Sequence, residues 1–282
     1  MPPLSAVPAF SSVDGLVEAA LAGELGGPPP RELVATSVFW THHGTRLAGG
    51  DTTYLNQYVL VRLGASFGGC AFEAGEVDPG ICRDASGAPL DVLLREAPRP
   101  VRIAALDAYL SHLRPHRLAA RSGQAEPVTL PHGTPELRAA ARDAAIAGLL
   151  DIEQGAKVGL IGVVNPLVAA IRERGGEPLP CDFNLKATQW GDPVTADMHE
   201  VLSRAQAVVA TGMTLSNGSF DTILERCRTQ GLPLVVYAQS GSAVARAFLG
   251  AGVTALSAEP FPFSQFSAEE TVLYRYRGAG GA

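Results

Sequence analysis

The sequence predicts an α/β protein in which a Rossmann-like parallel sheet follows a smaller α+β unit. After Lys157, short apolar runs alternate with helical patterns, from KVGLIGVV to VTALS. These runs are apolar on both faces, which is typical of parallel strands covered by helices on both sides of a sheet. Before residue 130, strand-like segments stand between two amphipathic helices instead.

The first part of the chain predicts a compact set of two helices and three strands. Apolar residues at helical spacing and runs bounded by glycine-rich turns mark these elements. The predicted helices span 13–25 and 102–113, and the predicted strands span 33–40, 58–63 and 69–72. Residues 119–133 are polar and contain glycine and proline, which indicates a linker. We therefore expect a smaller α+β domain at 1–130 and a Rossmann-like domain at 131–282.

The second part predicts five strands that alternate with helices. Thr134 and Pro135 form a typical helix start, and Asn165 with Pro166 predicts a second one, with Asn165 as the cap. The predicted strands span 157–164, 177–183, 206–212, 232–240 and 253–257, and the predicted helices span 134–150, 167–174, 196–205 and 242–249, with another around Ile223.

Composition excludes several classes of function. The net charge of −6 and the pI near 5.5 argue against a nucleic-acid partner. The sequence has no apolar run long enough for a membrane span and no signal-peptide pattern, and four dispersed cysteines suit reduced thiols. We expect a cytoplasmic protein, and the 31 glycines and 21 prolines are typical of a GC-rich bacterial genome.

The segment TGMTLSNGSF, residues 211–220, is the strongest candidate for a binding site. It connects an apolar strand to a helix, and such turns at the carboxyl ends of parallel strands bind small ligands. Thr211, Gly212, Thr214, Asn217 and Gly218 are the candidate ligand-binding residues. Helix capping by Ser216 or Asn217 is the alternative, but capping explains only one or two of these polar residues.

Other candidates follow neighbouring strands and are expected at the same edge of the sheet. Asn165 follows the first strand, Asp182 the second and Ser240 the fourth. Asp182 either binds a ribose hydroxyl or caps a loop. His42, from the first domain, is a candidate to line a cleft between the domains, and a solvated loop histidine is the alternative.

The sequence assigns no reaction. It lacks a Gly-x-Ser-x-Gly elbow, a Walker loop and a His-Glu-x-x-His motif, and Gly159 and Gly162 depart from the spacing of the dinucleotide fingerprint. Glu73, Glu76 and Asp78 form an acidic cluster that suits either a cation or a solvated turn. If a divalent metal ion binds, carboxylate, amide or imidazole ligands are expected rather than a cysteine cage.

These motifs together resemble the Rossmann-like "putative heavy-metal chelation" family. The shared features are the Gly-x-x-Gly strand end, the acid after the second strand, a Gly-Asp-Pro turn, the TGMTLSNGS loop and a serine-rich turn after the fourth strand. The resemblance implies an enolase N-terminal-like domain before the Rossmann-like one. Met213, where the family usually has a small residue, and Gln239, where it tends to have Gly-Pro, depart from the pattern.

The favoured function is therefore to bind or process a small anionic, metal-chelating metabolite in a cleft between the domains. One rival is a Rossmann enzyme of secondary metabolism that uses a nucleotide-type cofactor such as S-adenosylmethionine. Another is a non-catalytic accessory protein. The resemblance also suggests a homodimer, and we expect neither a nucleic-acid nor a membrane partner.

Overall fold

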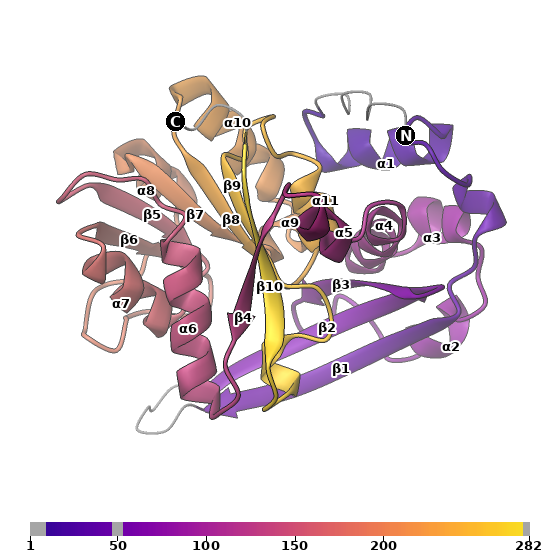
Figure 1. The fold of residues 1–282 in the computed structure, drawn as a ribbon, viewed down its shortest axis with the longest axis horizontal. Coiled ribbons are helices and arrows are strands. Elements are labelled where there is room, and N and C mark those ends of the chain that lie inside the picture. Colours follow the sequence, from indigo (N-terminus) through magenta and orange to yellow (C-terminus); the bar gives the residue numbers. More distant parts are fainter. Residues whose placement is uncertain (1–9, 47–52, 279–282) are drawn as a thin grey trace.

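The N-terminal unit is a three-stranded antiparallel sheet with helices packed on one face. The computed structural model describes residues 10–46 and 53–278, and Figure 1 shows this sheet beneath α4. The strands occur in the order β1 (Ser37–Arg46), β2 (Thr53–Leu63) and β3 (Ser66–Phe72). The helices are α1 (Val13–Ala22), η1 (Pro30–Glu32), α2 (Ile81–Ala85), α3 (Leu90–Glu96), α4 (Arg99–Leu113) and α5 (His116–Arg121).

Strand β3 and helix α4 pack unusually closely. A Cβ atom at Gly68 would lie only 2.0 Å from the backbone nitrogen of Ala108, so this contact requires glycine. The close contact brings Asp107 of α4 against the strand, where its Oδ2 accepts a hydrogen bond from Gly69 N at 2.9 Å.

The second sheet has seven strands in the order β4-β10-β9-β8-β7-β5-β6. Strands β5 to β9 pair in parallel, and β10 is antiparallel to β9 and to β4. Because β6 and β7 lie on opposite sides of β5, the winding direction of the chain reverses at β5. The strands are β4 (Glu126–Leu130), β5 (Lys157–Ile161), β6 (Glu177–Cys181), β7 (Ala207–Thr211), β8 (Leu234–Ala238), β9 (Ala255–Ala258) and β10 (Thr271–Arg277).

Helices cover both faces of this sheet, as its apolar strands predict. Helices α6 (Pro135–Ala147) and α7 (Asn165–Glu173) pack on one face. The other face carries α8 (Met198–Arg204), α10 (Phe220–Gln230) and α11 (Ser242–Arg246), and its core is continuous with that of the N-terminal unit. Two short helices complete the fold, α9 (Met213–Ser216) and η2 (Ser264–Phe266). The Rossmann-like fold class is confirmed.

Two predicted elements need correction, and one strand was not predicted. The predicted linker at 119–133 is wrong, because it contains the end of α5 and all of β4. Strand β4 lies at the edge of the sheet, where Pro127 is tolerated because one side of the strand has no neighbour. The predicted strand at 33–40 begins only at Ser37, after a 3₁₀ turn and an isolated bridge from Val34 to Pro89. Strand β10 was not predicted.

None of the helices within residues 10–46 and 53–278 has both the length and the apolar character that a membrane crossing requires.

Candidate ligand cleft at the carboxyl ends of β5, β6 and β7

A cavity of about 70 Å³ opens where the winding of the parallel sheet reverses. Ile161 and Gly162 end β5, Asp182 follows β6, and Thr211 ends β7, and all four residues line the cavity. The crevice outside such strand ends is where open α/β sheets bind ligands. The remaining lining residues are Glu73, Cys181, Phe183, Asn184, Met198, Met213, Thr214, Asn217 and Ser219.

The N-terminal unit contributes one wall of the cavity. Glu73 follows β3 directly, and the Nδ2 atom of Asn184 donates a hydrogen bond to its Oε1 at 3.4 Å. Asn184 belongs to the loop after β6. The cavity is therefore a cleft between the three-stranded unit and the parallel sheet, as the sequence predicts.

The carboxylate of Asp182 fixes the loops after β5 and β6. Its Oδ2 accepts from Val163 N at 2.9 Å, and its Oδ1 accepts from Asn184 N at 2.8 Å and Leu185 N at 3.2 Å. These contacts match the loop-capping interpretation of Asp182. An ionised carboxylate has about four acceptor positions, and these three contacts use most of them.

Two hydroxyl groups of the β7 turn bond to the turn itself. Thr214 Oγ1 donates to Thr211 O at 2.7 Å, and Ser216 Oγ donates to Met213 O at 2.8 Å. Both side chains thereby stabilise the single turn of α9. Thr214 lines the cavity, but its hydroxyl proton already has an acceptor.

Asn217 has one half of its amide engaged. Its Oδ1 accepts from Ser219 N at 3.0 Å and from Ser219 Oγ at 2.7 Å, whereas its Nδ2 makes no hydrogen bond to a described residue. Gly218 has φ +79°, a conformation that favours glycine and that turns the chain into α10. The turn therefore presents an amide donor beside the start of a helix.

Two carboxylates and the start of a helix line the cavity. Glu73 and Asp182 are the only formally charged residues among the described residues that line it. Ser219, which also lines it, is the N-cap of α10; no side chain caps the first turn of this helix, which contains the acidic Asp221. Free N–H groups at a helix N-terminus carry a partial positive charge and attract anions.

Five predicted site residues do not line the cavity. Asn165 is not a helix cap, which corrects the prediction: Val164 is the N-cap of α7, and Asn165 Oδ1 accepts from Gln189 N at 3.0 Å. Ser240 is buried, and its Oγ accepts from Ala71 N at 2.8 Å. His42 is exposed on β1. Gly212 and Gly218 shape the turn without lining the cavity. Ligand binding by these residues stays a prediction.

The described residues include no group of three or more His, Cys, Asp or Glu side chains placed to hold a metal ion. All four cysteines are free thiols. Burial, with the nearby Asp182 carboxylate, raises the pKa of Cys181 to about 11, so this thiol stays protonated at neutral pH.

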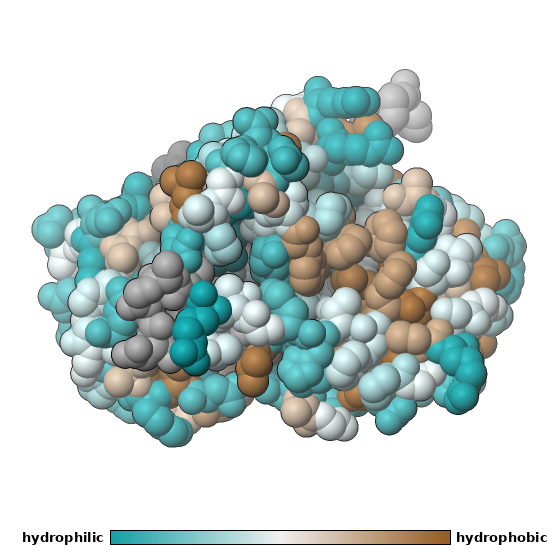
Figure 2. Space-filling model, turned by 90° about the horizontal axis from the view of Figure 1, so that it is seen from below, coloured by the Kyte–Doolittle hydropathy of each residue, from teal (hydrophilic) through white to brown (hydrophobic). Residues whose placement is uncertain are grey.

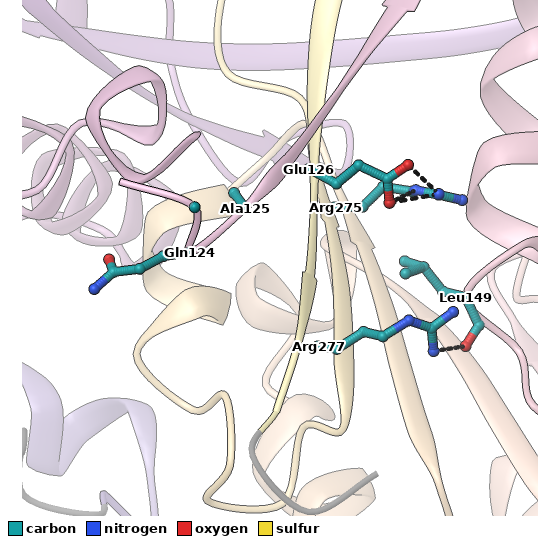
Figure 3. A pocket seen from close by; sticks show the side chains of 7 residues that line it. Gln124, Ala125, Glu126, Leu149, Arg275 and Arg277 are labelled. Atoms are coloured by element: carbon teal, nitrogen blue, oxygen red, sulfur yellow. Dashed lines mark hydrogen bonds and ion pairs between the residues drawn. The ribbon is translucent and has the colours of Figure 1, made fainter. Parts of the chain in front are cut away.

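A second cavity lies at the other end of the sheet and is larger, about 250 Å³ (Figure 3). Its two arginines are already engaged. Arg275 Nη2 lies 2.6 Å from Glu126 Oε2, and Arg277 donates to Leu149 O at 3.2 Å and Gly148 O at 3.1 Å. These contacts join β10 to β4 and to the chain just after α6. The cavity lies near the amino ends of the parallel strands, where open sheets do not bind their ligands.

The sequence did not predict three of the residues that line the cleft between the units. Glu73 was one member of an acidic cluster, and only the packing of the two units places it opposite Asp182. Met198 and Met213 carried a weaker signal, because the chain contains only three methionines. The rarity of methionine is the sequence feature that sets Met198 and Met213 apart, but rarity does not indicate where a residue lies in the fold.

The architecture defines a class: a Rossmann-like domain of flavodoxin-type strand order, preceded by a smaller α+β unit, with a cleft between them. Residues 144–259 match the DUF364 family, described as putative heavy-metal chelation, and the predicted resemblance is confirmed. No curated protein matches the chain.

Two solved structures of DUF364 family proteins have a similar overall fold. One, of unknown function, is from Desulfitobacterium hafniense; it has a TM-score of 0.60 at 16% identity and aligns over 94% of this chain and 98% of its own. The other, also of unknown function, is from Pyrococcus horikoshii; it has a TM-score of 0.52 at 15% identity and aligns over 87% and 86%. At these identities the likeness concerns the fold alone.

Proposed function

We propose that the cleft binds a small anionic metabolite together with a metal ion that the metabolite chelates. The observation that carries this proposal is the pairing of a carboxylate wall, Glu73 and Asp182, with the uncapped N-terminus of α10. A metal chelate carries one group that suits each of these two features of the cleft. Its metal ion attracts the carboxylates, and its anionic groups accept from helix N–H groups and from Asn217.

The small number of protein donors favours a chelate over a bare ion. The cleft offers two carboxylates, and no group of three or more classical ligand side chains occurs in residues 10–46 and 53–278. Metal sites in proteins usually need four or more ligands. The metabolite therefore supplies the remaining ligands. A free anion without its metal would face the Glu73 and Asp182 carboxylates and be repelled.

The rival function, binding of a nucleotide-type cofactor, draws support from Asp182 at the end of the second strand. Against it, three backbone N–H groups already donate to that carboxylate. An accessory protein with no ligand is the third alternative.

Thermal-shift and calorimetric titrations separate these three alternatives. The panel contains Zn²⁺ alone; nitrilotriacetate, citrate and histidine alone; their Zn²⁺ complexes; and S-adenosylmethionine with adenine nucleotides. We expect at least one complex to stabilise the protein more than its metal or its chelator alone. Stabilisation by the nucleotides only supports the rival, and no shift with any compound supports the accessory protein.

Glu73→Gln tests the carboxylate wall. Glu73 is exposed, so the variant is expected to keep its stability and to lose about fivefold in affinity for the complex, from ~1 kcal/mol of electrostatic attraction. Glu18→Gln is the matched control, because Glu18 is exposed on α1 and does not line the cleft. Equal affinities of the two variants would contradict the proposed role of Glu73.

The homodimer, the cytoplasmic location and the domain boundary at residue 130 stay proposals. Light scattering over a range of concentrations tests the homodimer.

Expression of residues 131–282 alone tests the domain boundary. Because β4 pairs with β10, a fragment that starts at 123 is expected to be more stable.

A further inference from the structure

Sulfur atoms are concentrated at the cleft. The chain has three methionines, and apart from Met1 both of them, Met198 and Met213, line this one cavity. Met198 is the first residue of α8, and Met213 is the first residue of α9. The two side chains therefore approach the cavity from separate elements.

Neither methionine belongs to the fully buried core. The buried apolar residues of the described chain are Ala, Val, Leu, Ile, Phe, Tyr and Cys, and none is methionine. Methionine usually fills irregular gaps in cores. Here both methionines are only half-buried, each against the margin of a hydrophobic cluster and beside the cavity.

Thioether sulfur is a soft, uncharged donor. Soft donors select soft ions such as Cu(I), whereas Mg²⁺, Ca²⁺ and Mn²⁺ select oxygen. The Cys181 thiol also lines the cavity but is only 3% exposed, whereas both methionines are half-buried. The available sulfur donors are therefore the two thioethers, while Glu73 and Asp182 compensate the positive charge of the ion.

We propose that the cleft selects a soft ion of the Cu(I) class, with the sulfur atoms of Met198 and Met213 as its ligands. This inference rests on the proposed function, because the ion completes its coordination with donors from the bound metabolite or with a cleft carboxylate.

The test measures Cu(I) affinity under anaerobic, reducing conditions by competition with bicinchoninate. Cys82, the cysteine that is not buried, is first replaced by alanine to remove an accessible thiol. Met198→Leu, Met213→Leu and the double variant are then compared in this background. Leucine keeps the apolar volume, and such exchanges usually cost less than about 1.5 kcal/mol of stability. Copper K-edge absorption reports directly whether sulfur binds the ion.

We expect each single variant to bind Cu(I) about tenfold more weakly, and the double variant more weakly still, with loss of the sulfur signal. Affinity for the Zn²⁺–nitrilotriacetate complex is measured in parallel and is expected to fall less than affinity for Cu(I), because uncharged thioether donors favour the softer ion. Cys181→Ala is expected to leave Cu(I) binding intact.

Three results overturn the inference: unchanged Cu(I) affinity in the folded double variant, loss of binding in Cys181→Ala alone, or Cu(I) binding without a sulfur signal. If the parent protein binds Zn²⁺ complexes but not Cu(I), the soft-ion inference fails and the proposed function stands. If it binds Cu(I) through the methionines but no chelate in the panel, the proposed function fails instead.

Discussion

The turns after β7 and β8 are neighbours at one edge of the sheet, and their compositions are similar, yet the structure uses them differently. The β7 turn faces the cleft through Thr214 and Asn217. The β8 turn faces the N-terminal unit, where Gly241 N donates to Gly69 O at 2.7 Å and Ser240 Oγ accepts from Ala71 N. Both turns contact the N-terminal unit, since Leu215 O of the β7 turn accepts from Arg99 Nε at 3.0 Å, but only the β7 turn lines this cavity.

The two turns differ in the groups that contact the N-terminus of the helix that follows each turn. At α11, Asp107 Oδ1 of the N-terminal unit accepts from Ala243 N at 2.7 Å, so a carboxylate already occupies that N-terminus. Beside it, His116 Nε2 lies 3.2 Å from Ser242 Oγ, and His116 Nδ1 lies 2.7 Å from Tyr276 Oη. At α10 no side chain caps the first turn. A polar turn therefore indicates a site only where its donors have no partner within the protein.

The largest expected effect is a loss of stability in acid through His116. Burial, and to a lesser extent Arg246, lowers the pKa of His116 to about 3. As the pH falls from about 6.5 towards 3, the unfolded chain takes up a proton that the folded chain does not. The free energy of unfolding then falls by ~1.4 kcal/mol per pH unit from this group.

Urea unfolding of the wild type and His116→Gln across this pH range isolates that contribution. Burial raises the pKa of Asp107 to about 7, which adds stability as the pH falls below that value. The Asp107 contribution is present in both proteins and cancels in their difference. A difference that does not change with pH would contradict a neutral, buried His116.

Asp107→Asn is expected to weaken the junction but not the cleft. Three backbone N–H groups donate to this carboxylate, and an amide presents only one acceptor atom to them. We expect a loss of ~1–3 kcal/mol in the free energy of unfolding at pH 8, and unchanged affinity for the metal chelate. Asp151→Asn, at an exposed position, is the control.

Asn217→Asp is expected to weaken binding of the metal chelate without lowering the stability of the protein. Aspartate keeps the two contacts that Oδ1 makes to Ser219, so stability should stay near that of the wild type. The variant loses the Nδ2 donor and adds a negative charge, so chelate affinity should fall about five- to a hundredfold, or ~1–3 kcal/mol. Unchanged affinity in calorimetry would assign Asn217 to the turn alone.

Ser240→Ala is expected to have the smallest effect and completes the contrast with Asn217. Removal of the hydroxyl leaves the buried Ala71 N–H without its acceptor, at an expected loss of ~1 kcal/mol of stability. Affinity for the chelate should not change. A loss of affinity without a loss of stability would instead support the prediction that Ser240 binds the ligand.

The sequence predicts the parallel strands well because their signal is local. Strands β5, β7, β8 and β9 are short, mostly apolar runs, as burial on both faces of the sheet requires, whereas β6, at the margin, is the mixed segment EPLPC. Strands β4 and β10 lie at or near the margin of the sheet, and their mixed sequences, EPVTL and TVLYRYR, resemble loops. Edge strands are less constrained by burial, so their pattern is weaker.

By itself, the sequence determined the fold class, the strand ends that line the cleft, and the polar β7 turn, because each depends on residues close together in the chain. Only the tertiary structure decided which polar groups remain without a partner in the protein. Asp182 and Ser240 both follow strands, but one lines the cleft and the other pairs with Ala71. Glu73 lines the same cleft as Met198 and Met213 because two units pack together, and no local pattern encodes that contact.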